Sequence, residues 1–139
     1  MAQPQKKVAL IINSASYERV AFALSLATAA AALGKEVSVL FGYGGLVRLK
    51  KGFTDQVGAE TDGWIREQIK AGLEKGSVSP ISELLETLRR LGGKLYACPT
   101  AMALHNLISG ELVAEVNRVC GLVQFLTEDA EDASMTIYV

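Results

Sequence analysis

The sequence predicts a three-layer α/β/α fold, in which helices cover both faces of a mainly parallel sheet of about five strands. Two observations predict it. Short apolar runs such as Val8–Ile12 alternate along the chain with longer segments of helical periodicity. No clear hairpin signal joins two of these runs, and an unbroken apolar run is typical of a strand covered on both faces. With 139 residues, the chain is expected to form a single domain, residues 1–139.

The first strand is expected at Val8–Ile12, directly after two lysines. Ser16 is a suitable N-cap for the helix that follows, and Gly34 is expected to end that helix. Only two residues of Val20–Leu33 are polar, whereas a surface helix shows a polar face with the helical period. We therefore expect this helix to pack on the sheet and also against a second element or a neighbouring subunit.

Later elements are predicted from periodicity and from residues that begin or end helices. Asp62 is a candidate N-cap, and Ser79-Pro80 places serine at an N-cap and proline at the first helical position. The stretch from Gly52 to Gly58 carries no clear signal. The expected elements are strands at Lys35–Phe41, Lys94–Cys98 and Met135–Val139, a short helix or turn at Leu46–Lys51, helices from Asp62 to Gly76, from Ser79 to Gly92, from Pro99 to about His105 and from Gly121 to about Ala130, and a helical turn followed by a short strand within Glu111–Val119.

The composition excludes several functional classes. Apolar residues make up 50% of the chain and charged residues 21%, so intrinsic disorder is excluded. The net charge of -1 argues against nucleic-acid binding, which needs a basic face. The high apolar content is typical of a homo-oligomer subunit, or of a domain that encloses a very hydrophobic sheet.

The location of the protein is expected to be cytoplasmic. No apolar stretch reaches the length of a membrane span. Met1–Lys7 is polar and the apolar run after it is broken at Asn13-Ser14, so no secretory signal is expected. The two cysteines are therefore expected to be reduced thiols rather than a disulfide framework.

Candidate site residues follow the expected strands, because ligands of open α/β sheets bind outside the carboxyl ends of the strands. Three loops leave such ends: Asn13-Ser14-Ala15, Gly42–Gly45 and Cys98-Pro99-Thr100. Cys98 is the candidate catalytic residue. The candidate substrate-binding residues are Pro99, Thr100, Asn13, Ser14, Gly44 and Gly45.

Cys98 is expected where a strand gives way to a helix, at or next to the N-cap. The first N–H groups and the dipole of a helix favour a thiolate over a thiol at that position. The other interpretation is that Cys98 is a small buried apolar residue, as free cysteines often are. The local pattern leaves both interpretations open.

His105 and Cys120 are the other residues with thiol or metal chemistry. His105 lies about 10 Å along a helix from Cys98, at 1.5 Å per residue, so a surface or packing role is expected rather than that of a base. Cys120 has the chemistry of a resolving thiol, but spacing does not place it near Cys98, and a packing role is favoured. Together the three residues lack the ligands of a zinc site, so no metal is expected.

Gly42–Gly45 is neither a P-loop nor a dinucleotide fingerprint. No Gly-Lys-Ser/Thr follows it, and it follows the second strand without a third spaced glycine. We interpret it as a flexible loop that permits a tight turn. We interpret Arg48, Lys50 and Lys51 as solvated charges, with attraction of an anion to the strand ends as the alternative, and Glu128–Asp132 as a solvated helix end.

Lys94–Cys98, followed after a three-residue gap by Met102, resembles the cysteine segment of the DsrE/DsrF-like family of sulfur-relay proteins. The resemblance extends over most of the chain, but not over Gly52–Pro80. Its other segments are Val8–Ile12, the Ala-rich helix, Gly34–Val37, Phe41, Gly45-Leu46, Leu49, Lys50, Glu111-Leu112, Gly121, Phe125-Leu126 and Thr136–Val139.

The resemblance implies a single α/β domain that forms homo- or hetero-oligomers, with a trimer or hexamer as the expected homo-oligomer, and it implies no cofactor. In relay members of the family, a cysteine at the Cys98 position carries a persulfide or thiosulfonate between partner proteins. The chain departs from the family where Pro99 follows the cysteine, and where His105-Asn106 replaces a turn expected to end in glycine. Because Asn also tolerates a left-handed cap, we expect the backbone of that turn to be retained.

The function expected from these observations is that of a sulfur carrier or sulfurtransferase-like protein. It would hold sulfane sulfur on Cys98 and pass it to a partner protein. The first alternative is a thiol redox protein that uses Cys98, with or without Cys120. The second is a non-catalytic oligomeric binding subunit.

Overall fold

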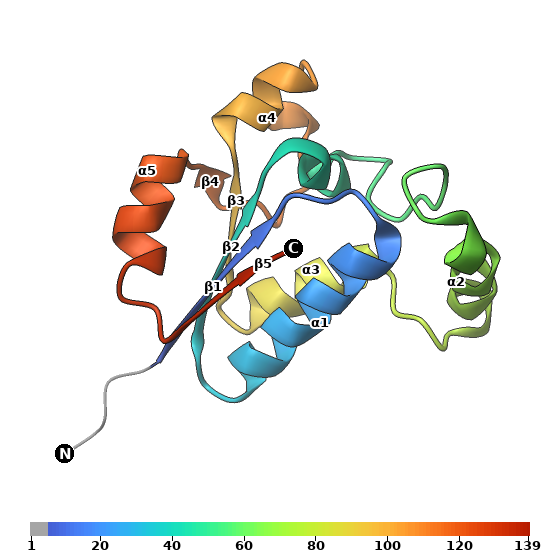
Figure 1. The fold of residues 1–139 in the computed structure, drawn as a ribbon, viewed down its shortest axis with the longest axis horizontal. Helices are drawn as coiled ribbons and strands as arrows, with labels where there is room; N and C mark the ends of the chain where they lie inside the picture. The colour runs from blue at the N-terminus through green and yellow to red at the C-terminus, as the bar shows by residue number, and fades with distance from the viewer. Residues whose placement is uncertain (1–5) are drawn as a thin grey trace.

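The structure is a computed structural model that describes residues 6–139. Within these residues, five parallel strands form one sheet in the order β4-β3-β2-β1-β5, with helices on both of its faces (Figure 1). The predicted three-layer α/β/α fold with a mainly parallel sheet is confirmed. Residues 1–5, which form most of the polar segment used to argue against a secretory signal, lie outside the described residues.

The elements follow the predicted order along the chain. The strands are β1 (Lys7–Ile12), β2 (Glu36–Phe41), β3 (Lys94–Ala97), β4 (Arg118–Val119) and β5 (Met135–Tyr138). The α-helices are α1 (Tyr17–Ala32), α2 (Gly63–Lys75), α3 (Ile81–Arg90), α4 (Pro99–Leu104) and α5 (Leu122–Phe125). Further helical segments are the 3-10 helices η1 (Tyr43–Leu49) and η2 (Ser109–Glu111) and the π-helix η3 (Leu126–Ala130), which continues α5.

The strand β1 lies inside the sheet, between β2 and β5. Val8 is opposite Val37 on β2 and opposite Met135 on β5. Val8, Leu10 and Ile12 are buried, as is the residue between the first two. Helices cover both faces of this strand, so both sets of alternating side chains meet apolar surroundings. This explains why the segment is an unbroken apolar run in the sequence.

The helices α1 and α3 cover one face of the sheet, whereas α5 and η3 cover the other (Figure 1). On the second face, Phe125 packs edge-on against Tyr96 of β3, with ring centroids 6.1 Å apart. The Ser38 hydroxyl on β2 donates a hydrogen bond of 2.7 Å to the buried Asp129 carboxylate on η3. The interpretation of the acidic run at residues 128–132 as a solvated helix end is therefore wrong for Asp129.

The helix α1 packs on β1 and β2 and also against α3. Tyr17, Val20 and Leu24 are fully buried in these contacts. The expectation that this apolar helix contacts more than the sheet is confirmed, and the second element is α3. Phe22 and Leu33 remain 68% and 78% exposed, so part of the apolar surface of the α1 segment is uncovered in the isolated chain.

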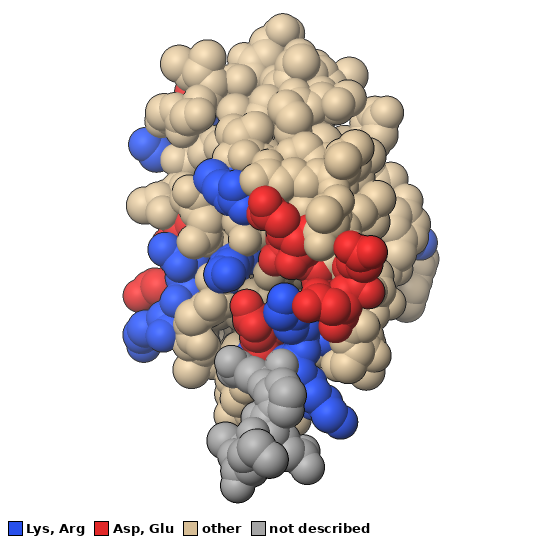
Figure 2. All heavy atoms as spheres, turned by 90° about the vertical axis from the view of Figure 1, so that its left-hand side faces the viewer, with Lys and Arg blue, Asp and Glu red and all other residues tan. Residues whose placement is uncertain are grey.

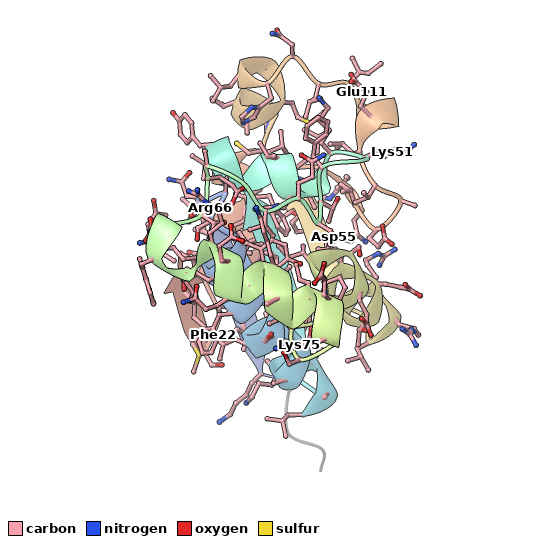
Figure 3. The ribbon with its side chains drawn as sticks, turned by 90° about the vertical axis from the view of Figure 1, so that its right-hand side faces the viewer. Phe22, Lys51, Asp55, Arg66, Lys75 and Glu111 are labelled. Carbon is pink, nitrogen blue, oxygen red and sulfur yellow. The ribbon has the colours of Figure 1, made fainter. Side chains whose placement is uncertain are left out.

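The segment between η1 and α2 supplies caps for two helices. Tyr17 N–H, in the first turn of α1, donates to the Thr61 hydroxyl at 3.0 Å. Ser82 N–H, in the first turn of α3, donates to the Asp55 carboxylate at 2.8 Å, and Figure 3 shows Asp55 beside α3. The prediction of Ser79 as the N-cap of α3 is wrong, because Pro80 occupies that position and a carboxylate distant in sequence binds the free amide.

Arg48 holds this segment against the rest of the chain. Its side chain is 1% exposed, so neither interpretation of it, as a solvated charge or as an anion attractor, is correct. The guanidinium donates to the carbonyl oxygens of Ala15 at 3.0 Å and Gln56 at 2.6 Å, and it pairs with the Glu60 carboxylate at 3.3 Å. It also lies over the Tyr17 ring, 5.0 Å from the centroid. Burial lowers the pKa of the Arg48 guanidinium, and the Glu60 carboxylate opposes that shift.

Lys50 and Lys51 connect η1 to the segment after α4. Lys51 Nζ donates to the Gly110 carbonyl oxygen at 3.0 Å, and its backbone N–H donates to Glu111 at 2.9 Å; Figure 3 shows Lys51 and Glu111 side by side. Lys50 Nζ lies over the Phe53 ring, 4.3 Å from its centroid. Both lysines therefore contact other parts of the protein and are not only solvated charges.

No helix within residues 6–139 combines the length and the apolar character that crossing a membrane requires.

Candidate functional site

Cys98 lies at the carboxyl end of β3 and is the N-cap residue of α4. Its own N–H donates to the Phe41 carbonyl oxygen at 3.0 Å, which extends the pairing of β3 with β2 by one residue. Its carbonyl oxygen accepts the Met102 N–H at 3.0 Å and so closes the first turn of α4. The predicted strand-to-helix placement is observed, and these two bonds fix the backbone of the cysteine.

The Cys98 side chain is largely covered in the isolated chain. The residue is 7% exposed, whereas Pro99 and Thr100 beside it are exposed. Pro99 has no N–H to offer, so the first amides of α4 are those of Thr100 and Ala101. The first amides of an α-helix have no acceptor within the helix and are available to an anion.

The three predicted loops lie side by side at the carboxyl ends of the strands, because β1, β2 and β3 are parallel neighbours in the sheet. Gly42 N–H donates to the Ile12 carbonyl oxygen at 2.9 Å. A Cβ on Gly45 would collide with that same carbonyl, and one on Gly44 would lie 3.4 Å from Ala15 N. The interpretation of residues 42–45 as a flexible loop is therefore wrong: Gly42 is the N-cap of η1, and Gly44 and Gly45 lie within η1 and permit its close packing on the first loop.

The hydrogen bonds of Asn13 and Ser14 are made with residues outside α4. Asn13 Nδ2 donates to the Tyr138 hydroxyl at 3.0 Å, and the Asn13 N–H donates to the Val139 carbonyl oxygen at 2.7 Å. Ser14 Oγ accepts the Ser16 N–H at 3.0 Å. Their hydrogen bonds thus connect the first loop to β5 and α1, so a role in binding substrate at Cys98 stays a prediction for both residues.

His105 fastens the end of α4 to η1. Its Nε2 lies 2.8 Å from the Tyr43 carbonyl oxygen. Since a carbonyl oxygen only accepts, Nε2 carries the proton in this contact and is not available as a base. The next residue, Asn106, has φ of 53°, so the left-handed turn expected at this position is formed without glycine.

Cys120 lies much closer to Cys98 than the sequence spacing indicates. The last register pair of β3 and β4 is Ala97 opposite Val119, and Cys120 N–H donates to the Ala97 carbonyl oxygen at 2.9 Å. The two cysteines therefore occupy the next position along the same two neighbouring strands. The sequence contained part of this signal, because both strands were expected to end close to a cysteine, but it did not contain the strand order.

The environment of Cys120 keeps its thiol protonated. Cys120 is 1% exposed, and this burial is the main reason why its pKa is raised above the ordinary value. The Arg118 cation opposes the shift, while Asp129, Glu128 and Cys98 add to it. The two thiols of the site thus differ in access to solvent, Cys98 being the less covered one.

The end of the molecule around Cys98 carries few charges. The segments 99–110 and 121–127, which include α4 and α5, contain no Lys, Arg, Asp or Glu. Figure 2 shows the charged side chains gathered over the opposite half of the α5 face. There Lys7 pairs with Asp132 at 3.1 Å and Arg118 with Glu128 at 2.9 Å. The helix that begins after Cys98 therefore offers an anionic sulfur backbone amides and no cationic side chain of its own.

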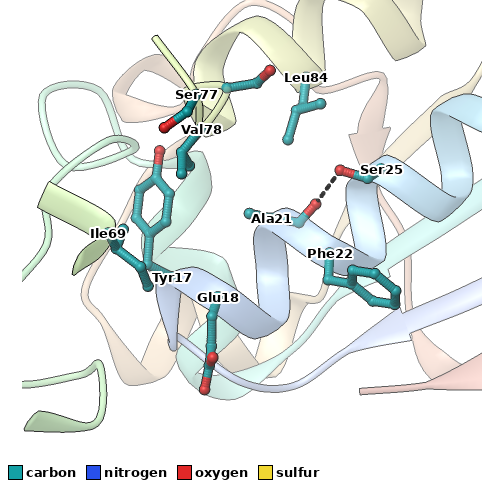
Figure 4. Close-up of a pocket in the computed structure, with 10 residues that line it drawn as sticks. Tyr17, Glu18, Ala21, Phe22, Ser25, Ile69, Ser77, Val78 and Leu84 are labelled. Atoms are coloured by element: carbon teal, nitrogen blue, oxygen red, sulfur yellow. Dashed lines mark hydrogen bonds between the residues drawn. The ribbon is translucent and has the colours of Figure 1, made fainter. Parts of the chain in front are cut away.

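A separate pocket of about 350 Å³ lies between α1 and the segment that leads into α3 (Figure 4). Tyr17, Glu18, Phe22 and Ile69 are among its lining residues, and the Tyr17 hydroxyl accepts the Ile81 N–H at 2.9 Å. The lining contains no cysteine or histidine and none of the predicted site residues. Among residues 6–139, no group of three or more His, Cys, Asp or Glu side chains is placed to hold a metal ion.

Comparisons with known proteins agree with this architecture. The family model described as the DsrE/DsrF-like family matches residues 6–131, which include both cysteines. The chain is 26% identical to the uncharacterized protein YrkE of Bacillus subtilis (strain 168), over the full length of both. Its fold is similar to that of the ychN protein of E. coli, with a TM-score of 0.71 and 17% identity over 97% of this chain and 100% of that one. It is also similar to MTH1491 of Methanobacterium thermoautotrophicum, a protein of unknown function, with a TM-score of 0.60 and 16% identity over 96% and 99% of the two chains.

Proposed function

The chain belongs to the DsrE/DsrF-like family, and from this membership we propose that it is a sulfur carrier in which Cys98 holds sulfane sulfur and passes it to a partner protein. The observation that carries the proposal is the position of Cys98, at a strand end and at the N-cap of α4, within the matched residues. Cys98 is also the less buried of the two cysteines.

The transfer chemistry needs only a thiolate and a sulfane-sulfur donor. The Cys98 thiolate attacks the outer sulfur of a donor persulfide, a sulfur–sulfur bond forms on Cys98, and the donor leaves as its own thiolate. With thiosulfate the same attack releases sulfite. If the donor protein holds thiosulfate on its own cysteine, the Cys98 thiolate attacks the sulfur bonded to that cysteine, the donor cysteine leaves as its thiolate, and Cys98 carries a thiosulfonate. In each case an acceptor thiol on a partner removes the sulfur in the reverse sense.

Backbone amides support the anionic forms of this sulfur. The N–H groups of Thr100 and Ala101 lie in the first turn of α4, directly after Cys98. Anionic groups are stabilised at that end of a helix. Pro99 contributes no donor, but its fixed φ suits the first helical position, so the proline departure from the family pattern is compatible with the site.

The partners of the proposed carrier are sulfur donor and acceptor proteins that reach Cys98 from the uncharged end of the molecule. Leu104, Ile108 and Val123 are 57%, 69% and 80% exposed there. Exposed apolar groups at the rim of a site are typical of a protein-docking surface. Because thiols stay reduced in the cytoplasm, we place the transfer in that compartment.

A homo-oligomer, a trimer or hexamer, is part of the proposal. The strand β5 is at one edge of the sheet, with Met135 and Tyr138 exposed, and Phe22 and Leu26 are exposed on α1. An edge strand with apolar side chains is a template for association with another chain. Contact between copies through these residues would cover apolar surface that the isolated chain leaves in solvent.

The experiment that tests the proposal measures cyanide-labile sulfur, which reports sulfane sulfur bound to protein. Protein treated with thiosulfate or polysulfide and then desalted is expected to release thiocyanate when cyanide is added. Cys98→Ser is expected to release none, whereas Cys120→Ser, which keeps Cys98, is expected to remain loaded. Equal release from wild type and Cys98→Ser would overturn the proposal. Intact biological function in Cys98→Ser would favour a non-catalytic binding subunit.

A further inference from the structure

Cys98 and Cys120 directly follow β3 and β4, at the position of the next register pair of these two strands. The ladder reaches Ala97 opposite Val119, and the bond from Cys120 N–H to the Ala97 carbonyl oxygen continues it. Cys98 still has extended backbone angles, φ −73° and ψ 129°. Neighbouring strands lie about 4.8 Å apart, which is within the roughly 4.4–6.8 Å between Cα atoms that a disulfide requires.

The alternation of side chains directs the two cysteines to the same face of the sheet. Two residues earlier, Tyr96 and Arg118 are in register, and the Arg118 guanidinium lies over the Tyr96 ring, 5.1 Å from its centroid. Phe125 of α5 packs edge-on against that same ring, so this is the face covered by α5. Side chains two positions apart in a strand point to the same face, and Cys98 and Cys120 follow Tyr96 and Arg118.

We propose that Cys120 is a resolving thiol, which discharges a Cys98 persulfide as hydrosulfide and leaves a Cys98–Cys120 disulfide. This inference rests on the proposed sulfur-carrier function. The Cys120 thiol gives its proton to solvent and its sulfur attacks Sγ of Cys98. The bond between Cys98 and its sulfane sulfur breaks, and the outer sulfur leaves as hydrosulfide. The sulfane sulfur is reduced by two electrons and the two cysteine sulfurs are oxidised, so no other oxidant is needed. A dithiol reductant then restores both thiols.

The burial of Cys120 slows this discharge. Burial is the largest effect on the Cys120 pKa and raises it. Asp129 and Glu128 on η3 and Cys98 after β3 also raise this pKa, whereas Arg118 on β4 lowers it. The thiolate is the attacking species, so a protonated Cys120 reacts slowly at neutral pH. A loaded Cys98 thus persists for a time during which an acceptor can take its sulfur. When no acceptor arrives, the sulfur is released as sulfide.

The test follows loaded protein after excess polysulfide has been removed by desalting. Wild type is expected to release sulfide with time and to lose both thiols together, and peptide mapping is expected to find Cys98 linked to Cys120. Cys120→Ser is expected to keep its persulfide about tenfold longer or more, because it lacks a thiol held beside Cys98. The wild-type peptide map does not depend on the folding of any variant.

The outcomes separate the two proposals. If wild type loads Cys98 but forms no Cys98–Cys120 disulfide, and keeps its sulfur as long as Cys120→Ser does, the resolving role is overturned while the carrier function stands. If neither protein gains sulfur on Cys98, the carrier function and the resolving role are both overturned.

Discussion

His105 Nε2 lies 2.8 Å from the Tyr43 carbonyl oxygen, so the end of α4 is bonded to the start of the 3-10 helix that follows β2. Tyr43 has φ of 36°, an unusual value for a residue with a side chain. The helix that begins at Cys98 is therefore held at both ends. The cysteine amide is bonded to Phe41, and the histidine ring is bonded two residues further along that same segment.

Replacing His105 is expected to weaken the fold without removing the sulfur chemistry. His105→Ala loses one hydrogen bond, and we expect the free energy of unfolding to fall by about 1 kcal/mol in urea titrations. His105→Gln keeps a donor and is the matched control, with a smaller loss. Sulfur loading of Cys98 is expected in both variants. Loss of loading in a folded His105→Ala protein would assign the histidine a chemical role.

Removing the Arg48 cation is expected to be strongly destabilising. Arg48→Met removes the donor to the carbonyl oxygens of Ala15 and Gln56 and the cation that pairs with the Glu60 carboxylate. Such losses cost about 3 kcal/mol or more in unfolding free energy. The matched control is Arg19→Met, at an exposed position of α1, where a change within about 0.5 kcal/mol is expected. Equal effects of the two substitutions in urea unfolding would contradict this role of Arg48.

Stability is expected to fall at alkaline pH because of Cys120. Its pKa is raised in the folded protein, so unfolding makes the thiol easier to deprotonate. The contribution is fully present below the unfolded pKa of about 8.5 and is lost as pH rises through the folded pKa. Burial also raises the pKa of Tyr17, so the Cys120 part is the difference between wild type and Cys120→Ala. Parallel curves of unfolding free energy against pH, from about 7 to 10, would contradict the assignment.

A charge on the exposed face of α1 is expected to reduce self-association. Phe22 is 68% exposed in the isolated chain, and the proposed contact between copies would bury it. Phe22→Glu is expected to shift the mass measured by light scattering toward that of one chain. Leu91→Glu, at an exposed leucine after α3, is expected to leave the mass unchanged. If wild type has the mass of a monomer, the homo-oligomer is contradicted directly.

The sequence predicts best those structural features that depend on residues close together in the chain. The strand Val8–Ile12 was predictable because an interior strand with covered faces needs apolar side chains at every position. The placement of Cys98 was predictable because strand, cysteine, proline and helix follow one another locally. The left-handed turn at Asn106 was expected from the family resemblance, because Asn can take the place of a glycine at a left-handed cap.

What the sequence did not predict depends on contacts between distant residues. The segment containing Asp55 and Thr61 has no periodic pattern, because it is fixed by Arg48 and by the helix ends that it caps. The buried state of Asp129 depends on Ser38 of a central strand. The position of Cys120 beside Cys98 depends on the pairing of β3 with β4. Local periodicity predicts single strands but not the order in which they pair.

Whether Cys98 carries sulfane sulfur can be read from the mass of the peptide that contains this residue. Wild type is incubated with polysulfide, trapped at once with an alkylating reagent and digested. The expected Cys98 peptide is heavier by one sulfur atom than the alkylated thiol peptide, with no such increase on the Cys120 peptide. A Cys98 peptide without added sulfur, under conditions that load a known persulfide carrier, would rule out the carrier function.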